Sequence, residues 1–168
     1  MKVNMSVKEE WSRTARIYGE SAVEKLAASR IAVFGVGGVG GFACEALARA
    51  GIGSIDIFDK DTVSLSNINR QIIALHSTVG KSKVEIMKER IEDINPDCNV
   101  NAYNVFYLPQ NADEYDLSIY DYVIDAFSLR TAETGGRRRS SRTEAYCVTS
   151  KAIYSNSCRR RSKTYPHS

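Results

Sequence analysis

Four closely spaced glycines stand between a short β-favouring run and an alanine-rich periodic segment. Glycine lets the backbone turn tightly and approach an anion, and the amides at the start of the next helix face a phosphate. An aspartate 19 residues beyond the last glycine is placed to accept hydrogen bonds from a ribose hydroxyl. The pattern predicts a site for NAD, FAD or ATP, although the glycines would also suit close helix–sheet packing alone. The residues are Gly35, Gly37, Gly38 and Gly40 in the turn, with Asp59 as the ribose acid.

Polar and basic side chains continue downstream of Asp59 in the patterns D-x-D, S-N-x-x-R-Q and G-x-x-K. A triphosphate that releases pyrophosphate needs more positive charge around it than a dinucleotide does. Arg70 offers a rigid fork of donors, and Lys83 offers a point charge. We expect Lys81 and Arg90 on the solvated face of a helix instead.

Apolar periodicity indicates which elements position these residues. Short runs rich in β-branched residues predict strands, and apolar residues at helical spacing between them predict helices. The order is helix, strand, helix, strand, helix, strand and strand, which is typical of a Rossmann-like, three-layer α/β fold with a parallel sheet and helices on its faces. Strands are expected at 31–34, 54–58, 100–106 and 122–126, and helices at 20–29, 39–50 and 81–94.

The combined motif, with its G-x-G-G-x-G turn, resembles the signature of the ubiquitin-activating-enzyme-like superfamily, to which ThiF and MoeB belong. Within that superfamily the sequence most resembles the tRNA threonylcarbamoyladenosine dehydratases. The resemblance runs from about Trp11 to Ala126. The matching stretches are 11–14, 18–20, 45–53, 69–75 and 89–98.

The resemblance implies ATP with magnesium, and adenylation of the threonyl carboxylate of a modified adenosine next to a tRNA anticodon. A neighbouring carbamoyl group then attacks the activated carbon and closes a ring. The resemblance makes Asn67, Arg70 and Lys83 the catalytic residues at the triphosphate, and Asp61 and Gln71 cofactor-binding residues. Arg13 matches an arginine that reaches, in relatives, into the partner subunit's nucleotide site. A homodimer is therefore implied, and the alternative for this residue is a surface arginine before the first helix.

Cysteine usage and hydropathy bound the class of protein. The four cysteines stand far apart, without a C-x-x-C pair for zinc or a redox couple. With 43% hydrophobic residues, no signal sequence and no uncharged run of membrane-spanning length, the chain is expected to be globular and cytoplasmic, with reduced thiols. We expect Cys44 in the core and Cys98 in a turn, and assign neither a catalytic role. No metal ligands are predicted.

Charge and pattern change together after Ala126. Residues 127–168 hold ten Lys and Arg against two acids, whereas residues 1–126 hold 13 bases and 18 acids. The basic segment is poor in branched aliphatics, so we expect a disordered tail that follows a ThiF-type domain of residues 1–126. Relatives place a second acid, which helps to hold the divalent cation, where this chain has Ser128. A reading-frame shift explains these features, and an evolved RNA-binding arm is the alternative.

Three further hypotheses about function stay open from the sequence. The chain could be the adenylating activator of a ubiquitin-like sulfur-carrier protein, which would then be its partner. It could be an NAD-dependent oxidoreductase, although that function leaves Asn67, Arg70 and Lys83 unexplained. It could also be a non-catalytic remnant whose sheet is unfinished.

Overall fold

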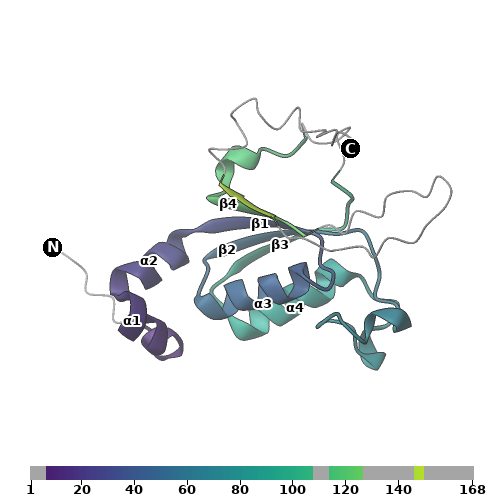
Figure 1. The fold of residues 1–168 in the computed structure, drawn as a ribbon, viewed down its shortest axis with the longest axis horizontal. Coiled ribbons are helices and arrows are strands. Elements are labelled where there is room, and N and C mark those ends of the chain that lie inside the picture. The colour runs from purple at the N-terminus through teal and green to yellow at the C-terminus, as the bar shows by residue number, and fades with distance from the viewer. Residues whose placement is uncertain (1–6, 108–113, 127–145, 150–168) are drawn as a thin grey trace, which may run out of the picture.

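A parallel sheet forms the centre of the molecule (Figure 1). The computed structural model describes residues 7–107, 114–126 and 146–149. The strand order is β3-β2-β1-β4-β5, in which the first four strands are parallel and β5 is antiparallel to β4. This order confirms the Rossmann-like fold expected from the sequence. The strands are β1 Arg30–Phe34, β2 Ser54–Phe58, β3 Asn99–Tyr103, β4 Tyr122–Asp125 and β5 Tyr146–Thr149.

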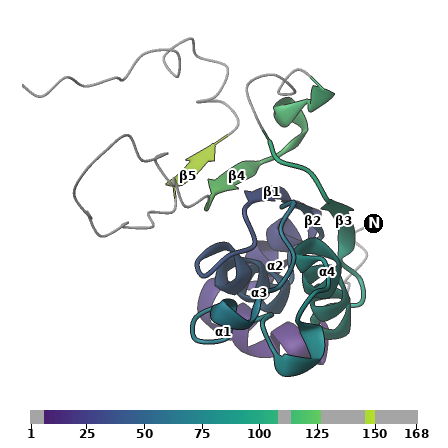
Figure 2. The same ribbon diagram turned by 90° about the vertical axis from the view of Figure 1, so that its right-hand side faces the viewer.

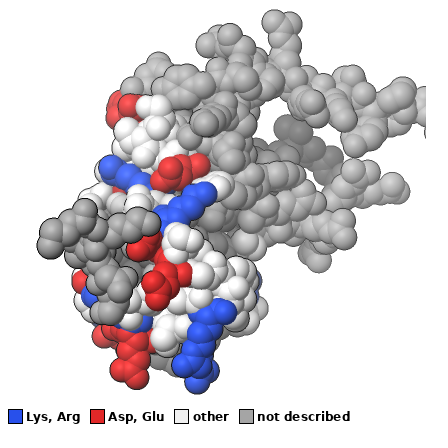
Figure 3. Space-filling model, turned by 90° about the vertical axis from the view of Figure 1, so that its left-hand side faces the viewer, with Lys and Arg blue, Asp and Glu red and all other residues white. Residues whose placement is uncertain are grey.

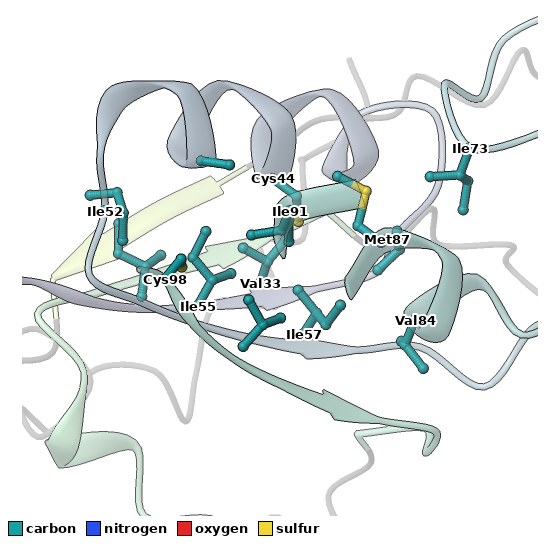
Figure 4. Packing of buried hydrophobic residues seen from close by; sticks show 14 of the residues in the cluster. Val33, Cys44, Ile52, Ile55, Ile57, Ile73, Val84, Met87, Ile91 and Cys98 are labelled. Atoms are coloured by element: carbon teal, nitrogen blue, oxygen red, sulfur yellow. The ribbon is translucent and has the colours of Figure 1, made fainter. Parts of the chain in front are cut away.

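One face of the sheet packs against helices α2, α3 and α4 (Figure 2). Successive strand residues point to opposite faces, so Val33, Ile55 and Ile57 share this side. All three are 0% exposed and belong to one buried cluster with Met87 and Ile91 of α4 (Figure 4). Burying one branched aliphatic side chain contributes about 1.5–3 kcal/mol, so this layer provides most of the fold's stability. The helices are α1 Ser12–Tyr18, α2 Glu20–Ala28, α3 Gly40–Ala50 and α4 Lys83–Ile94.

The opposite face carries an aromatic cluster instead of a helix layer, within the part of the chain that the structure describes. Phe58 stacks on Phe34 and on Tyr103, with ring centroids 4.5 Å apart in both pairs. Tyr115 meets Phe58 edge to face at 5.3 Å. Offset and edge-to-face pairs of this kind add about 0.5–1.5 kcal/mol beyond the area they bury. The aromatic side chains therefore close this face of the sheet at the carboxyl ends of β1 and β2.

A buried carboxylate fixes the amino-terminal half of the same face. Asp56 is 0% exposed and accepts hydrogen bonds from Arg30 Nη2 at 2.7 Å, Asn101 Nδ2 at 2.8 Å and the Tyr120 hydroxyl at 2.6 Å. Burial, and then the bond to Asp56, raise the pKa of Tyr120, so it stays a donor. A buried charge is tolerated when its hydrogen bonds are satisfied, and these bonds join β1, β2, β3 and the segment before β4.

Helices α1 and α2 pack at the end of the sheet where the strands begin. The ring of Trp11 lies against Gly51, where an added Cβ would stand 2.7 Å from its nitrogen. Lys8 pairs with Asp97 beyond the end of α4. This end of the molecule shows basic and acidic side chains side by side (Figure 3). No helix in the described segments is long and apolar enough to cross a membrane.

The observed elements differ from the sequence prediction mainly at their ends. Helix α4 begins at Lys83 instead of residue 81, and β3 ends at Tyr103 instead of residue 106. Helix α1 was not predicted, and it places Arg13 inside a helix instead of before the first one. The predicted tail of residues 127–168 lies outside the described residues except for Tyr146–Thr149. Those four residues form β5, and the disordered tail expected beyond Ala126 otherwise stays a prediction.

An ion-pair network joins the outer faces of α3 and α4. Glu45 accepts from Arg90 Nε at 2.6 Å and from Arg49 Nη2 at 2.8 Å, and its side chain is 13% exposed. Arg90, the larger influence, and Arg49 hold the pKa of Glu45 below its usual range. Arg90 is thus part of the helix surface, as predicted, and is engaged away from the candidate site.

Replacing Glu45 by glutamine is expected to lower stability near pH 7 by about 1 kcal/mol, the upper value for a partly exposed pair. Because the folded-state pKa of Glu45 is depressed, its contribution is complete above the ordinary carboxyl range and is lost as the pH falls towards the folded-state value. The difference in melting temperature between wild type and E45Q should therefore be about 2–4 °C at pH 7 and shrink in acid. A difference that stays constant down to pH 3 would contradict this assignment.

Candidate nucleotide-binding site

The turn between β1 and α3 requires glycine at two positions for packing. Gly35 has φ 89°, in the left-handed region that favours glycine, and its amide donates to the Phe58 carbonyl at 2.8 Å. A Cβ added to Gly40 would lie 1.7 Å from the Gly35 carbonyl oxygen and 3.2 Å from Ala126 Cβ. Gly35 and Gly40 therefore hold the turn against the sheet, whatever it binds.

Gly37 and Gly38 have no such packing requirement. A Cβ on Gly37 would meet only Gln71 Nε2 at 3.9 Å, and one on Gly38 would meet the Arg70 carbonyl oxygen at 3.6 Å. Both distances are ordinary van der Waals contacts, and neither residue has a positive φ. Helix–sheet packing thus explains half of the glycines, while the other two leave room for an anion to approach the backbone.

Asp59 ties the turn to the segment after β2. Its side chain is buried, and its Oδ2 accepts from the Val36 amide at 2.7 Å while Oδ1 accepts from the Asp61 amide at 2.8 Å. A carboxylate offers about four lone-pair sites, so these two bonds leave capacity for ribose hydroxyls. The predicted ribose acid is therefore in contact with the glycine turn, which its position in the sequence alone did not establish.

Lys83 begins α4 and lies in an ion pair with Asp61. Its Nζ is 2.8 Å from Asp61 Oδ2, and the lysine is only 5% exposed. The backbone supports the pair, because the Lys83 amide donates to the Asp61 carbonyl at 3.1 Å and Thr62 bridges antiparallel to Ser82. Both residues were predicted for the site, but their contact was missed. They are 22 residues apart, and no periodic signal links the two segments.

Asn67 shapes the loop that carries Arg70 and Gln71. It is 8% exposed, its Oδ1 accepts from the Ser64 amide at 3.0 Å, and its carbonyl accepts from the amides of Arg70 and Gln71. Arg70 Nη1 donates to the Ser66 carbonyl at 2.8 Å, which holds its guanidinium beside the loop. The loop turns back on itself and brings Arg70 and Gln71 against Gly38 and Gly37.

Gln71 supplies a buried polar atom without a partner. The residue is 8% exposed, and its Oε1 has no hydrogen-bond partner within the described part of the chain. Its Nε2 is the atom nearest to a Cβ on Gly37. An unsatisfied buried amide beside an open stretch of glycine backbone fits a polar ligand that completes its hydrogen bonds.

The structure brings together all the predicted site residues except Arg13. That residue is exposed on α1, whose neighbour Trp11 packs on Gly51 at the carboxyl end of α3, while the glycine turn is at the other end of this 11-residue helix. At about 1.5 Å per residue the two ends are about 16 Å apart, so Arg13 stays a prediction about a second subunit. The residues brought together are Gly35, Gly37, Gly38, Gly40, Asp59, Asp61, Asn67, Arg70, Gln71 and Lys83.

The site lies where the sheet reverses its strand order. Chain connections lead from β1 to β2 on one side, while β4 pairs on the other, and the Ala126 amide continues the register by donating to the Phe34 carbonyl at 2.8 Å. Ligands of open parallel sheets bind at this switch point, beyond the carboxyl ends of the strands. The strand order, the glycine turn and the acid after β2 together define a nucleotide-binding Rossmann-like domain.

Both described cysteines are buried away from this chemistry. Burial raises the pKa of the Cys44 thiol to about 12 and that of Cys98 to about 11. The thiol, and not the nucleophilic thiolate, is therefore the form present at neutral pH. The placement of Cys44 in the core is confirmed (Figure 4), and Cys98 packs against the same cluster.

Alkylation at pH 8 is expected to leave Cys44 unmodified in the folded chain and to modify it fully in denaturant. The reason is that its side chain is 0% exposed and protonated at this pH. Iodoacetamide labelling followed by peptide mass mapping measures the two fractions. Labelling of Cys44 in native buffer at the rate of the unfolded chain would show that the α3 layer opens freely.

A family comparison agrees with the domain that the fold and site define. The model of the ThiF family matches residues 11–156, so the chain belongs to this family. The match extends beyond Ala126, where the sequence predicts a boundary, and that boundary stays a prediction.

Individual relatives show which members of the family the chain is similar to. The chain is 49% identical over 119 residues to tRNA threonylcarbamoyladenosine dehydratase of Escherichia coli (strain K12), and 50% identical over 117 residues to that of Bacillus subtilis (strain 168). These matches cover 71% and 70% of this chain, but 44% and 46% of the relatives, so the chain spans less than half of their length. A crystal structure of the E. coli dehydratase in complex with ATP superposes with a TM-score of 0.71 at 46% identity, covering 76% of this chain and 53% of that one.

Proposed function

We propose that this chain is the ATP-binding part of an enzyme that adenylates the threonyl carboxylate of N6-threonylcarbamoyladenosine in tRNA and forms a cyclic dehydrated product. One observation carries the proposal. Contacts run without a break from the glycine turn through Asp59 and Asp61 to Lys83, and these residues lie at the switch point of the sheet. The chain that carries these residues is 49% and 50% identical to two tRNA threonylcarbamoyladenosine dehydratases over the residues matched.

The chemistry assigns a role to each group of residues. ATP supplies the adenylyl group that turns the carboxylate oxygen into a leaving group, which the carbamoyl group then displaces in closing the ring. The amides of Gly37 and Gly38 hold phosphate oxygens, and Asp59 accepts from the ribose. Arg70 and Lys83 balance the charge of the triphosphate, while Asn67 keeps the Arg70 loop in its turn. The closure is intramolecular, so the protein positions groups and needs no side-chain nucleophile.

Magnesium is part of the proposal through the triphosphate. The residues that the structure describes hold no group of three His, Cys, Asp or Glu that could form a metal site. Magnesium usually keeps several waters and needs only one or two carboxylates beside substrate phosphates. Asp125 ends β4 at the edge where the glycine turn lies, and Ser128, at the position of a second acid in relatives, is outside the described residues.

Three further parts of the proposal concern assembly and location. We infer a homodimer in which Arg13 completes the partner's site, because α1 holds this residue far from the glycine turn of its own subunit. The substrate is a tRNA, and the enzyme works in the cytoplasm, where the cell's main pool of tRNA lies. Sedimentation of the chain at several concentrations measures whether it forms the homodimer.

Nucleotide-dependent melting tests the proposal against its alternatives. A ligand at 100 times its Kd stabilises a fold by about 2.7 kcal/mol, so ATP with magnesium should raise the melting temperature while NAD should not. Stabilisation by NAD alone would favour an oxidoreductase, and non-cooperative melting would favour a remnant without a finished fold. Pyrophosphate release that depends on modified tRNA, together with the loss of the mass of one water from the modified nucleoside, would establish the dehydratase activity. Release that depends instead on a ubiquitin-like sulfur carrier would favour the activator, which the half-identical dehydratase relatives make the weaker candidate.

A further inference from the structure

The ion pair between Asp61 and Lys83 gives Asp61 a role apart from contact with the nucleotide. We propose that Asp61 is a positioning residue, which holds the Lys83 ammonium at the outer phosphates of ATP and couples it to the ribose acid Asp59. This inference rests on the proposed function and deepens it. It separates Asp61 from the residues that touch the nucleotide directly.

The two side chains differ in exposure in a way that suits this role. The Lys83 side chain is 6% exposed, whereas the Asp61 side chain is 55% exposed. A buried ammonium needs a hydrogen-bonded partner, because the cost of removing its hydration is otherwise not offset. Asp61 supplies that partner from a position in contact with water, so its own carboxylate has only a small desolvation cost. Lys83 therefore depends on Asp61 more than Asp61 depends on Lys83.

Backbone bonds fix the position of Asp61 on both sides. Its amide donates to Asp59 Oδ1 at 2.8 Å, and its carbonyl accepts from the Lys83 amide at 3.1 Å. Asp59 in turn holds the Val36 amide in the glycine turn. Asp61 is thus hydrogen-bonded both to Asp59, the acid expected to bind the ribose, and to Lys83, expected at the outer phosphates.

The pair leaves Lys83 able to bind phosphate. An ammonium carries three N–H donors, and the bond to Asp61 uses one of them. The carboxylate restricts the rotation of a side chain that otherwise has four flexible carbons. Lys83 is then already oriented when a phosphate oxygen arrives, and the ordering cost of binding is lower.

The test compares ligands that differ only in their outer phosphates. Titration calorimetry on the full chain gives Kd for ATP and for AMP in wild type, Asp61→Asn, Lys83→Met and the double variant. We expect Asp61→Asn to weaken the affinity for ATP by about 10- to 100-fold, which is the effect of losing a charge-assisted hydrogen bond. The affinity for AMP should change by less than about twofold. Adding Asp61→Asn to Lys83→Met should change the ATP affinity little further, because Asp61 acts through the lysine.

Two results would overturn the inference while leaving ATP binding intact. One is an unchanged ratio of ATP to AMP affinity in Asp61→Asn. The other is an equal loss on adding Asp61→Asn to Lys83→Met, which would make Asp61 a direct contact. A wild-type chain that melts cooperatively but binds no ATP would instead refute the proposed function, and the inference with it. If Asp61→Asn does not fold, Asp61→Glu keeps the charge and should retain most of the ATP preference, and loss of that preference in a folded Glu variant also overturns the role.

Discussion

Alanine at Gly37 is expected to remove ATP-dependent stabilisation without unfolding the chain. The new Cβ meets only Gln71 Nε2, at 3.9 Å, and the backbone is not in the left-handed region, so the fold accepts it. The methyl group occupies the space through which a phosphate approaches the backbone amides. The shift in melting temperature with saturating ATP should disappear, while the melting temperature without ligand stays within about 2 °C of wild type, since such a replacement changes stability by less than about 1 kcal/mol.

Gly38→Ala should behave in the same way, since its Cβ would stand 3.6 Å from the Arg70 carbonyl oxygen. The pair serves as a mutual control, because each variant blocks the turn at a different amide. An undiminished ATP shift in both variants would mean that the phosphates do not lie over these glycines. The glycines of the motif would then be explained by helix–sheet packing alone.

Alanine at Gly40 is expected to destabilise the fold by about 3 kcal/mol or more, the upper range for forcing atoms into a packed site. Its Cβ would lie 1.7 Å from the Gly35 carbonyl oxygen, a backbone atom held in place by the turn. Relief requires α3 to move away from β1, against which the core is packed. Against the 5–15 kcal/mol of a typical domain, this cost should lower the melting temperature by at least about 6 °C, measured by circular dichroism without ligand.

Gly41→Ala is the matched control, one residue along the same helix. Its Cβ would stand 3.3 Å from the Ile72 Cγ2 methyl, and a shift of a few tenths of an ångström in this half-buried side chain relieves the contact. We expect its melting temperature to remain within about 3 °C of wild type. Equal destabilisation by Gly40→Ala and Gly41→Ala would show that loss of glycine at the helix start, and not the overlap with Gly35, determines stability.

The central strands could be predicted from sequence because both fill the helix face with branched aliphatic residues. In β1 the run from Ile31 to Phe34 is apolar on both sides, whereas β2 alternates, with Ile55 and Ile57 on the helix face and Asp56 between them. Helices α3 and α4 bury one stripe each, so their 3.6-residue period was visible. The alternation of strands and helices then predicted a parallel sheet, while its strand order came from the structure.

Other elements left no such pattern. Helix α1 buries none of its residues, and Ile17 and Tyr18 are 74% and 71% exposed, so no inward stripe marks it. The third strand was predicted too long because Val105 and Phe106, which favour strands, follow Tyr103 after a single asparagine. Those residues leave the sheet after Tyr103, whose carbonyl accepts from the Asp59 amide as its last partner towards β2.

The site was predictable in membership but not in its contacts. Asp59 was selected by its distance from the glycine turn, and Asp61 and Lys83 were selected by the resemblance of the downstream motif. Which of them pair depends on the antiparallel bridge between Thr62 and Ser82, which no local preference encodes. The division of the glycines into two packing residues and two open ones likewise depends on atoms of Ala126 and Gln71, which are far away in sequence.

The two bonds on the Asp59 carboxylate are made entirely by protein atoms, so the glycine turn does not need a ligand to acquire its shape. A receptor that is already formed gives up little conformational freedom on binding. Nucleotide association with this turn should accordingly proceed as a single fast step without loop rearrangement, and differences in affinity between nucleotides should show mainly as differences in how long each one stays.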